Sequence, residues 1–155
     1  MQRKKTVLPL ILFLIATTLV AGIPKAETEN FTVAPETEVT RSLNLQKDDR
    51  AAISFTVVGQ SIHALNFYVT DPNGNVIVWH ATAGQKSFSL QAATPGVYTL
   101  HFDNSDWLEE KTVTLNYDVQ HYILGLPQTL FYVLIIAAIS VVGIVLFVVL
   151  GKGMY

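Results

Sequence analysis

LFYVLIIAAISVVGIVLFVVL, residues 130–150, is an uncharged apolar run close to the end of this 155-residue chain. Its 21 residues match the length that a helix needs to cross about 30 Å of hydrocarbon. Sixteen of them are Leu, Ile, Val or Phe, each of which favours membrane insertion by about 0.3 to 0.6 kcal/mol. A buried core helix is the alternative, but a chain of this size has too little other structure to cover such a helix on every side. The run therefore predicts a transmembrane helix at 129–150.

The start of the chain has the order of an export signal. Basic residues at 3–5 precede an apolar stretch at 7–20 and the small pair Ala21 and Gly22. We expect a signal peptide at 1–22, with cleavage after residue 21, 22 or 26 left open. An uncleaved signal anchor is the alternative. In both cases the middle of the chain lies outside the cytosol.

Charge around the apolar run predicts its orientation. The tail at 151–155 carries Lys152, whereas residues 118–128 hold one acid and no Lys or Arg. Together with an export signal, this asymmetry predicts type I topology. We expect an N-terminal domain at the cell surface or in the secretory lumen, one span in the lipid bilayer and a short cytoplasmic tail at 151–155.

Most of the chain's charge lies in the segment between the two apolar runs. All twelve acidic residues fall at 27–118, where only five basic residues accompany them, so this segment has a net charge of −7. Such a domain repels phosphate backbones and anionic headgroups, which argues against nucleic acid as a partner. The chain has no cysteine, which excludes disulfides, thiol catalysis and cysteine-based metal sites.

Apolar and polar residues alternate along most of this acidic segment. At 51–57, for example, Ala51, Ile53, Phe55 and Val57 share one side of a predicted strand. Similar patterns occur at 65–70, 87–91, 98–102 and 112–119, and weaker ones at 31–33, 39–45 and 75–80. Asp-Pro-Asn-Gly at 71–74 and Thr-Pro-Gly at 94–96 are turn signals. Seven or eight short strands predict an all-β ectodomain at 27–120, an antiparallel β-sandwich or jelly roll, followed by a connector at 121–128.

Four segments of this ectodomain resemble the GOLD domain of the emp24/gp25L/p24 family. They are FYVTDPNG at 67–74, GVYTL at 96–100, HFDNS at 101–105 and KTVTLNY at 111–117. The resemblance implies a β-sandwich outside a single span and an adaptor role in membrane trafficking or sorting. The family's cysteine pair, coiled-coil stretch and coat-binding tail residues have no counterpart here. The resemblance therefore supports the fold and the topology. It supports neither coat binding nor helix-mediated oligomerisation. A jelly-roll module of secreted peptidases also resembles the chain, over less of its length.

Two tryptophans are candidates for partner contact. Trp107 and Leu108 lie in an acidic loop, and Trp79 ends an apolar strand segment. An exposed aromatic residue can anchor a partner. The alternative for each tryptophan is that it caps the core of the sandwich.

Two other patterns predict a modification and a packing surface. Asn30-Phe31-Thr32 is an acceptor pattern for N-glycosylation at Asn30. Ala137, Ser140 and Gly143 recur at i, i+3 and i+6, and small residues on one face allow transmembrane helices to approach each other.

Nothing in the sequence predicts a catalytic residue, a cofactor or a metal site. The four histidines lack metal-ligand spacing, and Asp71, Asn73 and Asn75 begin like a calcium loop without its remaining ligands. Adjacent Glu109 and Glu110 would point apart, and no serine lies in a nucleophile elbow.

The sequence therefore favours a non-enzymatic, membrane-anchored binding module. Its expected partner is another exported or membrane protein, with a second copy of the chain as a further candidate. One alternative is a structural accessory subunit of a larger membrane complex. The other is a membrane-tethered domain that binds carbohydrate or lipid headgroups.

Overall fold

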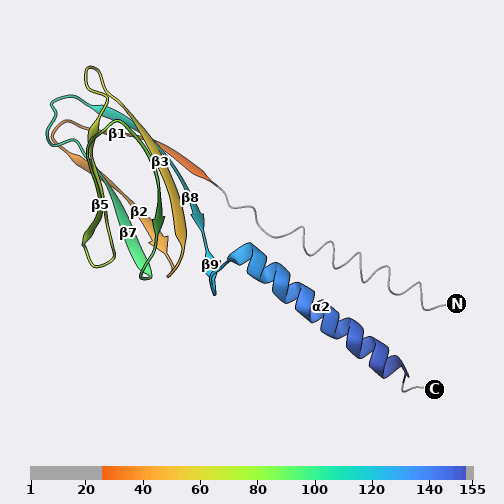
Figure 1. Cartoon of the computed structure of the whole chain (residues 1–155). Coiled ribbons are helices and arrows are strands. Elements are labelled where there is room, and N and C mark those ends of the chain that lie inside the picture. The colour runs from red at the N-terminus through yellow and green to blue at the C-terminus, as the bar shows by residue number, and fades with distance from the viewer. Residues whose placement is uncertain (1–25, 153–155) are drawn as a thin grey trace. The chain divides into compact units, whose positions relative to one another are not determined.

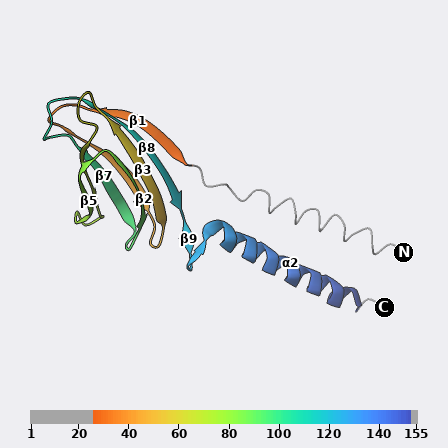
Figure 2. The same ribbon diagram turned by 45° about the horizontal axis from the view of Figure 1, so that its top comes forward.

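Strands with one apolar face each form two four-stranded antiparallel sheets that pack face to face (Figures 1 and 2). The computed structural model describes residues 26–152. The predicted signal peptide at 1–22 and the last three residues of the tail lie outside the described residues. The described chain contains a β domain and a helical segment.

Both sheets are built from strands distant in the sequence. The first sheet has the order β1 (Glu27–Val33), β8 (Lys111–Gln120), β3 (Arg50–Val58), β6 (Gln85–Gln91). The second sheet has the order β2 (Glu38–Leu45), β7 (Gly96–Asp103), β4 (Leu65–Thr70), β5 (Val76–Ala83). Every pairing between neighbouring strands is antiparallel. The predicted all-β sandwich is confirmed.

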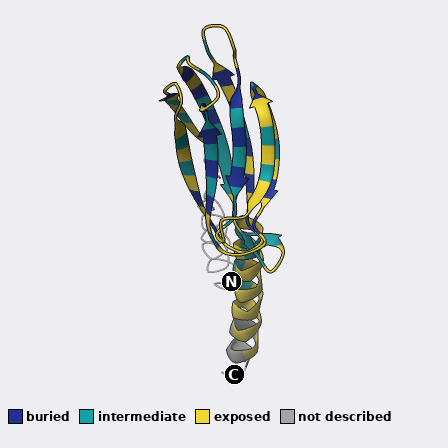
Figure 3. Cartoon of the chain, turned by 90° about the vertical axis from the view of Figure 1, so that its left-hand side faces the viewer, coloured by how far each residue is buried: buried dark blue, intermediate teal, exposed yellow. Residues whose placement is uncertain are grey.

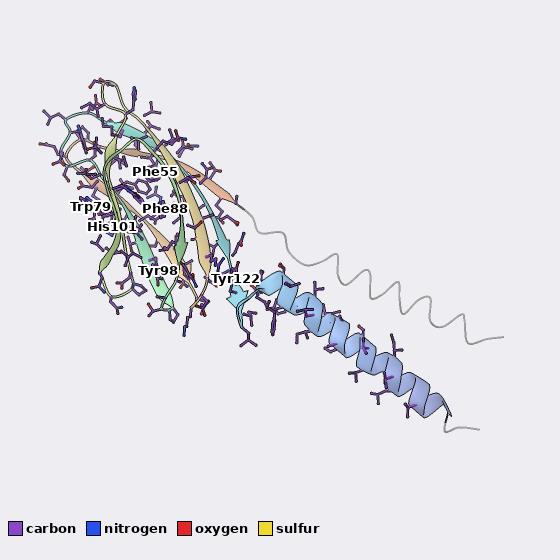
Figure 4. The ribbon with its side chains drawn as sticks, in the orientation of Figure 1. Phe55, Trp79, Phe88, Tyr98, His101 and Tyr122 are labelled. Carbon is purple, nitrogen blue, oxygen red and sulfur yellow. The ribbon has the colours of Figure 1, made fainter. Side chains whose placement is uncertain are left out.

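The core lies between the sheets and consists of the residues that the alternation placed inward. Burial alternates along the strands, as Figure 3 shows. Phe55 of β3 packs against Phe67 of β4 with ring centroids 4.6 Å apart and against Phe102 of β7 at 5.4 Å. Figure 4 shows Phe55 between the two layers. Since the chain has no disulfide, this burial of apolar side chains has to hold the sheets together.

The turn between β4 and β5 confirms the hairpin signal at 71–74. The Gly74 N–H donates to the Asp71 carbonyl at 2.9 Å, and Gly74 has a φ of 82°, which glycine adopts without strain. The Asp71 carboxylate accepts hydrogen bonds from the Asn75 side chain and from the backbone N–H groups of Asn73 and Asn75. These bonds, the Asn75 side-chain amide foremost, lower the pKa of Asp71. The turn itself therefore uses the carboxylate that a calcium loop would need.

An ion pair lies beside the two edge strands β1 and β2. The Arg41 Nε of β2 lies 2.6 Å from a Glu29 carboxylate oxygen of β1, and its guanidinium lies 4.1 Å from the Phe31 ring centroid. The pair thus connects the first sheet to the second along this side of the sandwich.

The helical segment contains α2 (Gln128–Lys152), preceded in the chain by the short strands β9 (Tyr122–Ile123) and β10 (Leu126–Pro127). Within α2, Gln128–Leu146 is long and apolar enough to cross a membrane. The Ser140 hydroxyl donates to the Ile136 carbonyl at 2.7 Å, so the helix itself satisfies this polar group. A Cβ added at Gly143 would meet no other atom within 4 Å. Helix association through the face formed by Ala137, Ser140 and Gly143 stays a prediction.

Candidate functional site

The two outer faces of the sandwich differ in chemistry. Thr, Ser and Asn side chains dominate the outer face of the first sheet: Thr28, Asn30, Thr32, Ser54, Thr56, Ser87, Thr112, Thr114 and Asn116. The outer face of the second sheet instead carries aromatic rings from three adjacent strands. This second face is the stronger candidate for recognition, because rigid aromatic side chains contribute large contact area at low entropic cost.

Trp79, Tyr68 and His101 form an aromatic row across β5, β4 and β7. Tyr68 stands opposite Trp79 on one side and opposite His101 on the other. The Tyr68 and His101 rings stack at 4.2 Å with an interplanar angle of 7°, and the Tyr68 and Trp79 rings stack at 5.3 Å and 29°. Figure 4 labels Trp79 and His101 on the same layer of the sandwich. Such cross-strand pairs stabilise a sheet and fix the orientation of each ring.

Glu38 of β2 holds the row in place. Its carboxylate accepts a hydrogen bond from the Tyr68 hydroxyl at 2.8 Å and lies 2.5 Å from the His101 Nδ1. The other ring nitrogen of His101 lies 3.0 Å from the Thr70 hydroxyl. Burial, followed by the hydrogen bond and charge of Glu38, raises the pKa of Tyr68 to about 12. A tyrosine hydroxyl is protonated at neutral pH even at its ordinary pKa, so the bond to Glu38 is present there, and the raised pKa extends it to more alkaline pH.

Trp79 is the accessible end of the aromatic row. Although it stacks on Tyr68, 55% of its surface remains exposed. Val76 and Ile77 on the same strand are exposed as well. Exposed apolar side chains next to a fixed aromatic ring are typical of a protein contact surface.

The loop at 104–110 places its two candidate residues differently. Trp107 is half-buried against the core, and its carbonyl accepts a hydrogen bond from the Glu36 N–H at 3.2 Å. Leu108 is 83% exposed. Of the three residues predicted to contact a partner, Trp79 and Leu108 therefore lie on the surface, whereas Trp107 contacts the core as the capping alternative expects.

An ion pair between buried Lys111 and half-buried Glu109 lies beside the loop at 104–110, and the sequence patterns did not predict it. Lys111 is completely buried, and its ammonium donates to the Glu109 carboxylate and to the Ile62 carbonyl. Glu109 also accepts hydrogen bonds from the Ser61 N–H, the Ser61 hydroxyl and the Ile62 N–H. These bonds, that from Lys111 foremost, lower the pKa of Glu109 to about 2. Each ionised group is occupied by partners within the fold, so the cluster is structural.

Asp49 ties the connector to the sandwich. This buried carboxylate accepts hydrogen bonds from the Gln46 N–H at 2.8 Å and the Tyr122 N–H at 3.2 Å, and it lies 2.6 Å from the His121 Nδ1. The Arg50 guanidinium lies 4.9 Å from the Tyr122 ring centroid. The first two connector residues are therefore fixed to the turn between β2 and β3.

The remaining predicted residue of the ectodomain, Asn30, is exposed on edge strand β1. Its side-chain oxygen accepts a hydrogen bond from the Thr114 hydroxyl at 2.7 Å. Glycosylation at Asn30 stays a prediction. Among residues 26–152, no three His, Cys, Asp or Glu side chains converge on a position that could hold a metal ion.

Comparison with solved structures matches this chain to bacterial proteins of low sequence identity. A periplasmic inhibitor of g-type lysozyme from Aeromonas hydrophila is 13% identical, with 63% of this chain and 88% of that chain covered and a TM-score of 0.44. A mitogen from Yersinia pseudotuberculosis is 14% identical, with coverages of 65% and 91% and a TM-score of 0.47. No curated protein matches the chain.

Comparison with protein families gives a match to the emp24/gp25L/p24 family/GOLD over residues 30–126. The matched region contains most of β1 and all of β2 to β8, together with the four segments that carried the resemblance. The match covers more than half of the chain, and a single span-length apolar helix follows it. The chain belongs to the emp24/gp25L/p24 (GOLD) family.

Proposed function

We propose that this chain is a non-enzymatic, type I membrane adaptor whose external sandwich binds another exported or membrane protein. The binding surface is the outer face of the second sheet, centred on Trp79. The observation that carries the proposal is the aromatic row, whose rings are stacked and held by Glu38 while Trp79 remains accessible. Membership in a non-enzymatic trafficking family and the apolar helix support the same function.

Preorganisation makes this face suited to binding. A partner that covers Trp79 gains the burial of a large ring without first having to order it, because Tyr68 already fixes one face of that ring. The domain's net charge of −7 favours a partner with a neutral or basic contact surface.

Trp79→Ala is expected to abolish most partner capture in crosslinking experiments on intact membranes. Removing a central aromatic anchor typically weakens binding by about 2 kcal/mol or more, which corresponds to roughly 30-fold. The fold should persist, because over half of the ring surface is exposed and the ring lies outside the core. Captured neighbours are identified and quantified by mass spectrometry.

Leu108→Ala is the matched control, because it removes an exposed apolar side chain from the loop at 104–110. Trp79→Tyr should restore much of the capture. If Leu108→Ala loses the neighbours while Trp79→Ala keeps them, the binding surface lies on the loop and the proposal is wrong. Replacing the span at 129–150 by an unrelated one should leave capture intact, and its loss would instead favour an accessory subunit of a membrane complex.

A further inference from the structure

We propose that the partner contributes an extended segment that adds to the free edge of β5 as a fifth strand of the second sheet. The inference rests on the proposed function, because it states how the partner binds to the face that carries Trp79. Within residues 26–152, β5 pairs with β4 on one side and with no strand on the other. Its outer edge therefore presents backbone N–H and C=O groups that another strand can use.

β5 differs from the other three edge strands in having no charged residue. β1 carries Glu27 and Glu29, β2 carries Glu38 and Arg41, and β6 carries Lys86. The sequence of β5, VIVWHATA, has no Lys, Arg, Asp, Glu or Pro and is rich in strand-forming residues. Proteins normally protect edges against unwanted strand addition with charges, prolines or β-bulges. β5 has no charge and no proline, and only the short stretch between its two bulges is open to an added strand.

The accessible part of this edge is short and apolar. Val76 is 54% exposed and Ile77 is 44% exposed, next to Trp79. The pairing with β4 shifts register twice, between Val69 and Thr70, where Ile77 has no partner, and between Leu65 and Phe67, close to Thr82 with its φ of 50°. These irregularities limit the regular edge to about four residues, 78–81. An added strand there would place alternate side chains beside Trp79 and Ala81 and so extend the aromatic row.

Carboxylates lie at both ends of this uncharged edge. Asp71 lies in the turn that leads into β5. At the other end Asn66 connects Thr82 to Asp106: its side-chain oxygen accepts from the Thr82 N–H at 3.2 Å, and its side-chain nitrogen donates to the Asp106 carboxylate at 2.7 Å. The occupant that fits is an uncharged extended segment that pairs with about four residues of β5 and carries Lys or Arg on both flanks.

A second copy of the chain lacks the charges that this edge requires. Two β5 strands related by a two-fold axis pair antiparallel, which brings the Asp71 end of one copy to the Asp106 end of the other. Carboxylates then face carboxylates at both ends of the pair, and like charges repel. The occupant is therefore a segment of a different protein.

The test uses the full chain in nanodiscs of neutral phosphatidylcholine and a synthetic probe that is not taken from this chain, Lys-Lys-Thr-Val-Thr-Val-Thr-Val-Lys-Lys. One version of the probe is N-methylated on alternate residues, so it keeps one hydrogen-bonding edge and cannot aggregate through the other. A second version is N-methylated on both sets of residues and has the same side chains without a usable edge. We expect the first to bind at least tenfold more tightly than the second, and to slow hydrogen exchange of backbone amides in β5.

Two variants test whether the one-edge probe binds at the edge of β5. Ile77→Lys places a charge on the β5 edge and should weaken binding of the one-edge probe at least tenfold, whereas Ser87→Lys, on the outer face of edge strand β6, should leave it unchanged. Unchanged thermal unfolding of both variants confirms that they fold. Equal binding of the two probes, or no binding of either, overturns strand addition.

The outcomes separate this inference from the proposed function. If Trp79→Ala loses its captured neighbours but the one-edge probe does not bind, the face is the binding surface and strand addition is wrong. If the probe binds while Trp79→Ala keeps its neighbours, the edge can accept a strand but the proposed binding surface is wrong.

Discussion

Glu109→Ala is expected to lower the thermal unfolding midpoint of the β domain by several degrees. Without this carboxylate, the buried Lys111 ammonium keeps only the Ile62 carbonyl as a hydrogen-bond partner. A buried charge left without its ionic partner destabilises the fold. Each kcal/mol of lost stability shifts the midpoint of a domain of about 100 residues by about 4 °C. Near-ultraviolet circular dichroism of the full chain in detergent micelles measures the transition.

Glu110→Ala is the matched control, because this neighbouring carboxylate is exposed. We expect it to change the midpoint little. Adding Lys111→Met to Glu109→Ala should recover most of the loss, because an apolar side chain then replaces the unpaired charge. Equal midpoints for Glu109→Ala and Glu110→Ala would show that the buried pair does not stabilise the fold.

The pKa of Glu109 also predicts how the stability of the β domain changes at acidic pH. In the folded protein the pKa of Glu109 is lowered to about 2 from an ordinary value of 4.5, chiefly by the hydrogen bond from Lys111. Because the folded pKa is the lower one, the stabilisation is complete above pH 4.5 and is lost as the pH falls towards 2. The wild-type midpoint should therefore fall more steeply than that of Glu109→Gln between pH 5 and pH 2.

Side-chain alternation predicted most of the fold correctly. The inward positions on β3, β4 and β7 were evident because an apolar residue recurs at every second position, and all of the residues so placed at 51–57 are buried. The turn at 71–74 was predictable for a local reason, since Asp71 and Gly74 determine it within a few residues. The family followed from short segments that lie in these same strands and turns.

The candidate site was only partly predictable. Trp79 was a candidate from its type and position, but its neighbours Tyr68, His101 and Glu38 come from three other strands. Their meeting depends on strand order and register, which alternation within one strand does not reveal. Lys111 was different, because it stands in the same inward set as Val113 and Leu115. Its position among inward-facing residues therefore indicated a buried cation. Nothing in the sequence indicated that the loop at 59–64 would contact it.

Phe102→Ala is expected to destabilise the domain by roughly 3–5 kcal/mol, the usual cost of removing a buried phenylalanine ring. Phe102 is completely buried, and its ring lies 5.1 Å from the Phe31 ring and 5.1 Å from the Phe67 ring by centroids. Phe31 belongs to the first sheet and Phe67 to the second, so this ring connects the two layers. Denaturation by urea, followed by tryptophan fluorescence, measures the change in the free energy of unfolding.

The size of this effect decides how a cysteine-free member of the family stays folded. A domain of about 100 residues has a total stability of only about 5–15 kcal/mol, so the loss of one ring removes a large share of it. Phe102→Leu keeps most of the volume and should cost less than half as much. His101→Ala, one residue away on the outer face, should cost less still, because it opens no cavity in the core. If Phe102→Ala proves no more damaging than His101→Ala, the sheets are held together by something other than the aromatic core, and the connection through Arg41 and Glu29 becomes the next candidate to test.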